Sequence, residues 1–272
     1  MFLILKVVHC YFEILQKDRN KEYTKYAVLD WVLLNKMIGK SQDPFYIFDG
    51  LICDELALLS DAKTRKNIQL IESIHLQRFV LSFWLGNYAD ADEAYKLAAS
   101  CSSFQMPKIH FLFHTFYRGL ISFQMYRDGE GEEWFEEGKT VLNKFDSWHC
   151  NYVSNVENKL LLLRAEYMAA TCEINGARAA YEASIKSAQD HGFVHEQGLA
   201  YEFMGMFLNS VVETSAALVC FKHAYECYMQ WGAIAKADQI RMKYNFDLLK
   251  EELNSVTIKR GREHESRLEN AC

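Results

Sequence analysis

Two histidines four residues apart, His191 and His195, lie in the segment QDHGFVHEQGLAYEFMGMFLN. The carboxylates of Glu196 and Glu202 follow them closely in the sequence. Imidazole and carboxylate groups on one helix face can bind a metal ion or transfer protons. Gly192, however, is well placed just past a helix end, because glycine readily adopts the positive φ that such positions often require. We therefore predict that the two histidines belong to different helices and that this segment is a joint.

The same segment predicts how the two helices of the joint are built. His191 falls in the last turn of the first helix, where a positive charge is favoured, and His195 falls in the first turn of the second. The second helix should bury a stripe made of Leu199, Phe203 and Met206. Glu202 lies at the edge of this stripe, so we predict that its carboxylate makes a buried or half-buried structural hydrogen bond.

A second candidate metal site lies in the segment CFKHAYEC, which offers Cys220, His223 and Cys227. At helical spacing these side chains share one face, and thiolate and imidazole are ligands that Zn²⁺ prefers. The segment HFLFH likewise places His110 and His114 on one face, but a metal would need a further ligand from elsewhere. A small alanine lies between His223 and Cys227, and the segment HFLFH is otherwise aromatic. Both features favour packing between helices over metal binding at these two segments. We predict no metal site.

Paired carboxylates are a further candidate for acid–base chemistry, at Glu132 and Glu133 and again at Glu136 and Glu137. General acid–base catalysis needs a cleft and a shifted pKa, whereas a plain run of charges usually forms a solvated helix face. The sequence contains no GxxxxGK[ST], GxGxxG, HExxH or GxSxG motif. We therefore predict that the chain has no catalytic, cofactor-binding or metal-binding residues and is not an enzyme.

The composition predicts the elements that carry these residues. Half of the 272 residues are hydrophobic, but only two prolines and 13 glycines occur. Strands need turn residues about every 8 to 12 positions, so the chain should be almost entirely helical. The net charge of −6 disfavours a nucleic-acid partner. The N-terminal apolar stretch is too short and polar to span a membrane, and scattered cysteines fit free thiols in a reducing compartment. We predict a cytoplasmic protein without membrane insertion.

The helices are predicted to pair as antiparallel hairpins. A bulky apolar helix is repeatedly followed by a short break and a second helix, with a period of roughly 35 to 45 residues. The breaks fall near Gly86, Gly129, Gly176 and Val212. Small residues let the helices of a hairpin approach closely, and each hairpin must stack on the next to bury its apolar face. This pattern predicts an all-α fold, an α-solenoid of stacked antiparallel helical hairpins in a tetratricopeptide-like superhelix.

The rest of the chain is predicted from the same patterns. Before the repeats we expect three helices, at about 2–17, about 22–38 and about 44–60. A last helix is predicted from about 233 to 250. No linker rich in proline or serine interrupts residues 1–250, so we predict one helical-repeat domain there. The polar remainder, residues 251–272, is predicted to be a frayed or disordered tail.

Four stretches carry a resemblance to a known family region: FYRGLISFQM, WHCNYVSNVENKLLLLRAE, AAYEASIKSAQDHGFVHEQGLAYEFMGMFL and AYECYMQWGAIAKADQI. The third is similar to a Tyr-x-x-Ala-Ile-x-x-Ala helix, a small break and a Glu-x-x-Leu-Ala-x-Glu helix. The fourth is similar to a closing A-x-x-x-Y-x-x-W-G-A-x-A-K signature. Together they resemble the tetratricopeptide-like helical segment of large signalling proteins, which join it to serine/threonine kinase-like, AAA-type ATPase and hybrid sensor histidine kinase modules.

The resemblance implies an architecture and a role, but no catalysis, because these 272 residues contain none of the family's catalytic motifs. Ser184 and Gly198 stand where the family usually has alanine. The leading hypothesis is a non-catalytic helical-repeat scaffold in signal transduction, a fragment or relative of a multidomain kinase/ATPase. Such a scaffold would bind a protein partner or another domain of its parent on a concave face lined by alternate helices.

Two alternatives from other functional classes stay open. The first is a metal-dependent module that uses Cys220, His223 and Cys227 as ligands. The second is a small-molecule sensor with an aromatic pocket, formed by Phe111, Phe113, Phe116 and Tyr117.

Overall fold

The structure is a computed structural model that describes residues 29, 33, 35–39, 46–48, 51–53, 55–101, 108–149 and 153–245. In these residues the fold is helical apart from one short hairpin of two strands. The elements in chain order are β1 (Tyr46–Phe48), β2 (Leu51–Cys53), α3 (Glu55–Thr64), α4 (Ile68–Trp84), α5 (Tyr88–Ser100), α6 (Lys108–Arg127), α7 (Glu132–His149), α8 (Val153–Ala170), α9 (Ile174–Asp190), α10 (Val194–Ser210), α11 (Thr214–Trp231) and α12 (Ile234–Tyr244). The helix predicted at about 2–17 and the tail predicted at 251–272 lie outside the described residues.

Strands replace part of the helix that the sequence predicts at about 44–60. β1 and β2 pair in antiparallel fashion, with Phe48 opposite Leu51. That prediction is therefore wrong in its first half, because α3 begins only at Glu55. The physical reason lies in the residues themselves, since aromatic and β-branched side chains favour strands. The two residues between the strands are aspartate and glycine, a pair typical of tight hairpin turns.

The turns between the C-terminal helices recur at a constant spacing. Positive φ occurs once every twenty residues there, at Cys172, Gly192, Val212 and Gly232. After each of these residues the next N–H bonds the carbonyl five positions back, as Phe193 bonds Ala188 at 2.9 Å. This pattern is the Schellman ending, in which a left-handed residue satisfies the last free carbonyls of a helix. Each helix of this region, with its turn, therefore occupies the same length of chain.

The predicted breaks near Gly86, Gly129 and Val212 are confirmed, because each residue has positive φ in a turn between two helices. The break predicted near Gly176 is present between α8 and α9, but its turn residue is Cys172, four positions earlier, where φ is 61°. Gly176 itself lies in the first turn of α9. Gly176 serves packing instead, because a Cβ on this residue would lie 3.0 Å from a methionine sulfur on α8.

Neighbouring helices pack in pairs: α4 with α5, α6 with α7, α8 with α9, and α10 with α11. Buried alanines make the close approach possible, and each lies five residues after a turn residue: Ala91, Ala177 and Ala217. Glycine acts in the same way on α10. A Cβ on Gly205 would lie only 2.6 Å from the ring of Phe221 on α11, so the two helices touch at this point.

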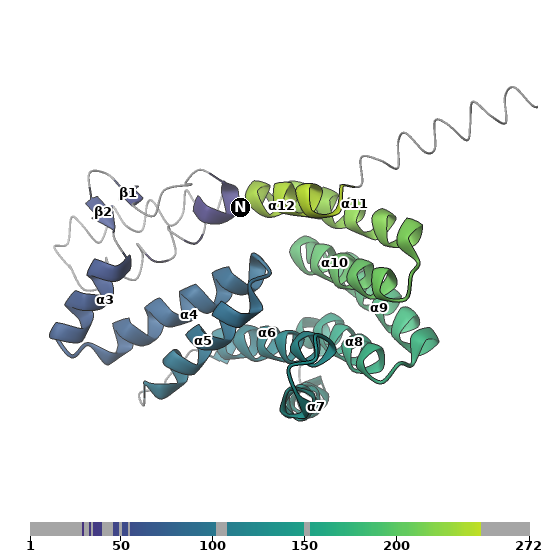
Figure 1. Cartoon of the computed structure of the whole chain (residues 1–272), viewed down its shortest axis with the longest axis horizontal. Helices are drawn as coiled ribbons and strands as arrows, with labels where there is room; N and C mark the ends of the chain where they lie inside the picture. Colours follow the sequence, from purple (N-terminus) through teal and green to yellow (C-terminus); the bar gives the residue numbers. More distant parts are fainter. Residues whose placement is uncertain are drawn as a thin grey trace, which may run out of the picture.

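The pairs follow one another along a curve from α4 to α12, as Figure 1 shows. The two ends of the curve meet. Trp84, at the end of α4, packs against Trp231 of α11 with ring centroids 5.2 Å apart. Gln239 of α12 donates a hydrogen bond of 2.5 Å to the carbonyl of Leu85, and Gly39 lies against α12. We call this contact between the end of α4 and the pair α11–α12 the closure.

The last described helix is shorter than predicted. α12 ends at Tyr244, and Asn245 follows it in the left-handed conformation with φ of 43°. Asparagine is one of the few residues other than glycine that adopts this conformation at a helix end. α12 therefore ends six residues before position 250, the predicted end, and residues 246–250 lie outside the described part of the chain.

Candidate binding site at the centre of the helix array

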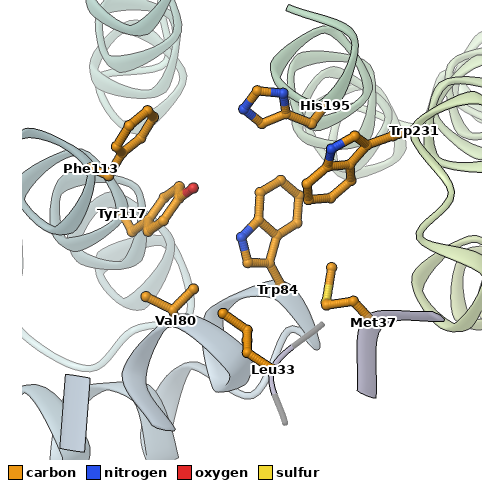
Figure 2. Close-up of a pocket in the computed structure, with 8 residues that line it drawn as sticks. All are labelled: Leu33, Met37, Val80, Trp84, Phe113, Tyr117, His195 and Trp231. Carbon is orange, nitrogen blue, oxygen red and sulfur yellow. The ribbon is translucent and has the colours of Figure 1, made fainter. Parts of the chain in front are cut away.

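A cavity of about 200 Å³ lies where the closure brings the ends of the array together. Its walls come from α4, α6, α10, α11 and the helical residues before Gly39, as Figure 2 shows. The lining side chains are mostly apolar or aromatic: Leu33, Met37, Val80, Trp84, Phe113, Tyr117, His195 and Trp231. Because these residues come from both ends of the array, the closure completes the wall of the cavity.

Aromatic rings fix the shape of this cavity. The ring of Trp84 lies edge-on to Tyr117 at 5.9 Å and tilted against Trp231 at 5.2 Å. His195 stacks on Trp231 with centroids 5.1 Å apart and ring planes 25° apart. Both tryptophans are the last residues of their helices, so the tight turns that follow hold the two rings in place. Phe113 completes this group beside Tyr117, at 6.3 Å.

A buried ion pair lies behind His195. The carboxylate of Glu196 is almost fully buried, and Lys159 Nζ lies 2.7 Å from its Oε1. The amide of Asn158 also donates to this carboxylate, and His195 Nε2 lies 3.5 Å from it. Burial alone would raise the pKa of Glu196, but His195 and Lys159 outweigh burial and lower the pKa to about 2. The carboxylate is therefore ionised at neutral pH.

Aromatic side chains surround this ion pair. Lys159 Nζ lies 5.2 Å from the ring of Phe113 and 5.3 Å from the ring of Phe193, and aromatic faces attract such a cation. Burial raises the pKa of the Tyr117 hydroxyl above its usual range, and the carboxylate of Glu196 raises it further. Tyr117 is therefore neutral and can donate a hydrogen bond into the cavity.

The structural hydrogen bond predicted for Glu202 is confirmed. The hydroxyl of Tyr228 donates to Glu202 Oε2 at 2.7 Å, and Lys236 Nζ donates to Oε1 at 2.8 Å. Glu202 is buried on α10, whereas its partners come from α11 and α12. Burial raises the pKa of Tyr228 well above its usual range, and the carboxylate of Glu202 raises it further. This cluster joins three helices, and it contacts the cavity lining through Tyr228, whose ring lies edge-on to Trp84 at 6.0 Å.

The predicted joint around Gly192 is also confirmed. α9 ends at Asp190, Gly192 has φ of 72°, and His195 stands in the first turn of α10. His191 Nδ1 lies 2.8 Å from the carbonyl of Ser187 on its own helix. The two histidines therefore belong to different helices. In the predicted stripe on α10, Leu199 and Phe203 are buried and Met206 is half-buried.

The candidate metal ligands Cys220, His223 and Cys227 have different environments. Both thiols are buried, and burial raises their pKa to about 11. The imidazole of His223 is exposed, with Nδ1 3.3 Å from a carboxylate oxygen of Glu226. In the part of the chain that the structure describes, no group of three or more histidine, cysteine, aspartate or glutamate side chains could hold a metal ion.

The candidate residues of α6 are divided among different contacts. Phe113 and Tyr117 line the cavity, whereas Phe116 packs on Phe145 in the core and Phe111 on Trp148. The aromatic pocket predicted from this segment is thus half present in the structure. His114 is buried with its ring edge-on to Phe79 at 5.8 Å, as a packed face requires. The side chain of His110 lies outside the described residues.

The acidic run of α7 divides into two parts. The exposed part agrees with the predicted solvated face and comprises Glu132, Glu133 and Glu136. Glu137 instead accepts two hydrogen bonds of 2.7 Å from Arg118 on α6. The guanidinium of Arg118 also donates to Asp92 of α5 at 2.6 Å. Glu137 is therefore part of a link between three helices.

Several residues at the site were not singled out from the sequence. Trp84 and Trp231 are the main ones, and each stands one or two residues before a glycine turn, in WLG and WG. A bulky ring beside a turn is held rigidly, which is a usable sequence signal. The ion pair also has a signal, since Lys159 is a charged residue directly before four leucines. Its partner Glu196 lies in the first turn of α10, where acidic residues are common whether or not they are buried.

The fold and the site define a helical protein in which paired helices curve around a small aromatic cavity. The cavity offers ring faces for stacking and hydrogen-bonding groups on Tyr117 and His195. Compared with models of known protein families, with curated proteins and with solved structures, the chain shows no match. Among the described helices, none is both long enough and apolar enough to cross a membrane.

Proposed function

We propose that the chain is a non-catalytic scaffold, an α-solenoid of tetratricopeptide-like hairpins that holds a protein partner or another domain of its parent protein in cytoplasmic signal transduction. The observation that carries this proposal is the spacing of the turns from Cys172 to Gly232, twenty residues each. Equal repeats that contact mainly their neighbours are the basis of helical-repeat arrays, which serve as extended binding surfaces.

The buried charges support a structural role. Glu166 is fully buried on α8, where Arg127 of α6 lies 2.7 Å from it and the hydroxyl of Tyr181 donates to it. Glu196 and Glu202 have the same kind of arrangement, each with a basic partner on another helix. Burial raises the pKa of Glu166, and Arg127 opposes this rise. These carboxylates thus connect helices to one another, and their geometry is accounted for by that connection.

Reconstitution with a purified partner tests this function. The chain would be used as bait in extract of its own cells, and each captured protein would then be purified and mixed with it. We expect a stoichiometric complex in which amide exchange slows on at least two adjacent helix pairs, because an array presents a continuous surface. We also expect no ATP turnover by the purified chain. ATP hydrolysis, or failure of every purified candidate to form such a complex, would contradict the proposal.

A further inference from the structure

We propose that the central cavity binds one uncharged, planar aromatic molecule of about the size of indole. This binding activity does not rest on the scaffold function, because its ligand is a small molecule and its lining residues are not those that carry the scaffold proposal. The proposal stands on three properties of the cavity: its volume, the arrangement of its rings and the balance of charge around it.

The volume sets the size of the ligand. The cavity measures about 200 Å³, and an apolar protein cavity of about 150 Å³ is known to stay free of water and to bind benzene. The space here is somewhat larger than one ring needs. Two fused rings, as in indole, fit this volume better than a single ring or a nucleotide.

The rings that line the cavity favour a flat aromatic ligand. Trp84 is edge-on to Tyr117 with ring planes 75° apart, and it is tilted by 43° against Trp231. Wall rings in several orientations can meet a planar guest both face-on and edge-on, which are the two favourable geometries of aromatic pairs. The remaining wall is aliphatic or thioether, from Val80 and Met37, and adapts to the edge of the guest.

The balance of charge selects an uncharged ligand. Near the cavity, Lys159 and Glu196 neutralise one another at 2.7 Å, and neither of them is among its lining residues. The lining contains no carboxylate, lysine or arginine that could serve as the counter-charge of a cation or an anion. Taking either ion out of water into this apolar space would therefore be unfavourable.

Two polar groups can orient a neutral guest. The hydroxyl of Tyr117 and the ring of His195 both face the cavity in Figure 2. An N–H or O–H group on the rim of the ligand can reach one of them. The side chain of His195 is 28% exposed.

Calorimetric titration of the whole chain with indole tests the proposal. We expect saturable binding of one indole per chain, with a negative change in heat capacity, since apolar surface is buried. Tryptamine and indole-3-acetate carry the same indole ring system with a positive or a negative charge, and we expect each to bind at least about tenfold more weakly. No saturable heat with indole, or tighter binding of either ion, would overturn the proposal.

Two matched variants place the binding in the cavity. Val80→Phe fills the space and should weaken indole binding by at least about tenfold, whereas Val219→Phe, on the exposed face of α11, should leave it unchanged. Thermal unfolding would show that both variants are folded. If Val80→Phe does not fold, Trp231→Ala takes its place, because it removes a stacking surface. Indole affinity that stays at the wild-type level in the folded cavity variant would overturn the proposal.

Discussion

Two buried carboxylates on one helix, Glu196 and Glu202, stand six residues apart and are exposed to the same small extent, 5%. Each holds a lysine from a different helix: Lys159 of α8 for Glu196, and Lys236 of α12 for Glu202. Their surroundings differ. Glu202 also accepts the hydroxyl of Tyr228 inside the packed core, whereas Glu196 lies beside the cavity. α10 is thus fastened to the array on one side and to the closure on the other.

The difference shows that the surroundings of an ion pair determine how much stability is lost when one partner is removed. A buried pair adds little net stability compared with apolar residues, but removal of one partner leaves an uncompensated charge. At Lys236 one aromatic face, that of Tyr228 at 5.7 Å, and the amide oxygen of Gln239 at 3.3 Å lie near the ammonium. At Lys159 two aromatic faces already contact the ammonium. We therefore expect the region of Glu202 to respond more sharply to substitution than the region of Glu196.

The largest loss of stability is expected from substitution of Glu202, on the side of α10 that faces the closure. Glu202→Gln keeps the size of the side chain but leaves the ammonium of Lys236 buried without a counter-charge. We expect the free energy of unfolding to fall by about 3 to 5 kcal/mol, measured by urea denaturation followed by circular dichroism. The double variant Glu202→Gln with Lys236→Met removes both charges and should recover most of this loss. A single variant as stable as the wild type would show that the pair does not hold α12.

A smaller loss is expected on the cavity side. Glu196→Gln leaves the ammonium of Lys159 between its two aromatic neighbours, Phe113 and Phe193. Since cation–π contacts of a desolvated cation are worth up to about 2 kcal/mol, we expect a loss of about 2 kcal/mol in the same urea experiment. Lys159→Met in the Glu196→Gln background is the matched control. Equal losses for Glu196→Gln and Glu202→Gln would break the comparison.

The next largest loss of stability is expected at the contact between α10 and α11. Gly205→Ala places a methyl group 2.6 Å from the rigid ring of Phe221, and we expect a destabilisation of about 1 to 2 kcal/mol. Gly176→Ala is the matched control, because its methyl group meets only the flexible end of Met168 at 3.0 Å. There the gain in helix propensity should leave stability unchanged or slightly higher. The two melting temperatures, measured by calorimetry, should move apart; a shared shift would contradict this account.

The smallest expected effect is the acid dependence of stability. The pKa of Glu196 is about 2 in the folded chain and about 4.3 when unfolded. A lowered carboxyl pKa stabilises the fold above the unfolded value, and this contribution is lost as the pH falls towards 2. Between about pH 5 and pH 3.5 the wild type should lose about 1 kcal/mol more than Glu196→Gln, measured by urea unfolding at each pH. Parallel pH profiles would rule out this origin.

The helices and their pairing could be predicted from the sequence because their signals are local. Apolar periodicity, a low number of turn residues and glycines such as Gly192 each act within a few positions. The errors have local causes too. The turn before α9 falls at Cys172, although cysteine seldom adopts positive φ. The strands β1 and β2 are only three residues long, so they carry too little alternation to be distinguished from helix in the sequence.

The cavity could be predicted only in part, because its wall depends on residues far apart in the chain. Phe113 and Tyr117 stood out as an aromatic run on one helix. Trp84 and Trp231 come from opposite ends of the array, and no local sequence pattern predicts that their rings are in contact. The role of Glu202 was predictable, since a lone carboxylate at the edge of an apolar stripe must find a partner.

The hydrogen bond from Gln239 to Leu85 joins positions 154 residues apart, whereas the bond between Lys236 and Glu202 spans only 34. This contrast sets an order of folding events. Helix pairs form from nearby residues and are fast, but a contact over a long loop gains stability only after the entropy of closing that loop has been lost. The helix pairs should therefore assemble first and the two ends join last. The aromatic cavity would then be the final part of the molecule to take shape.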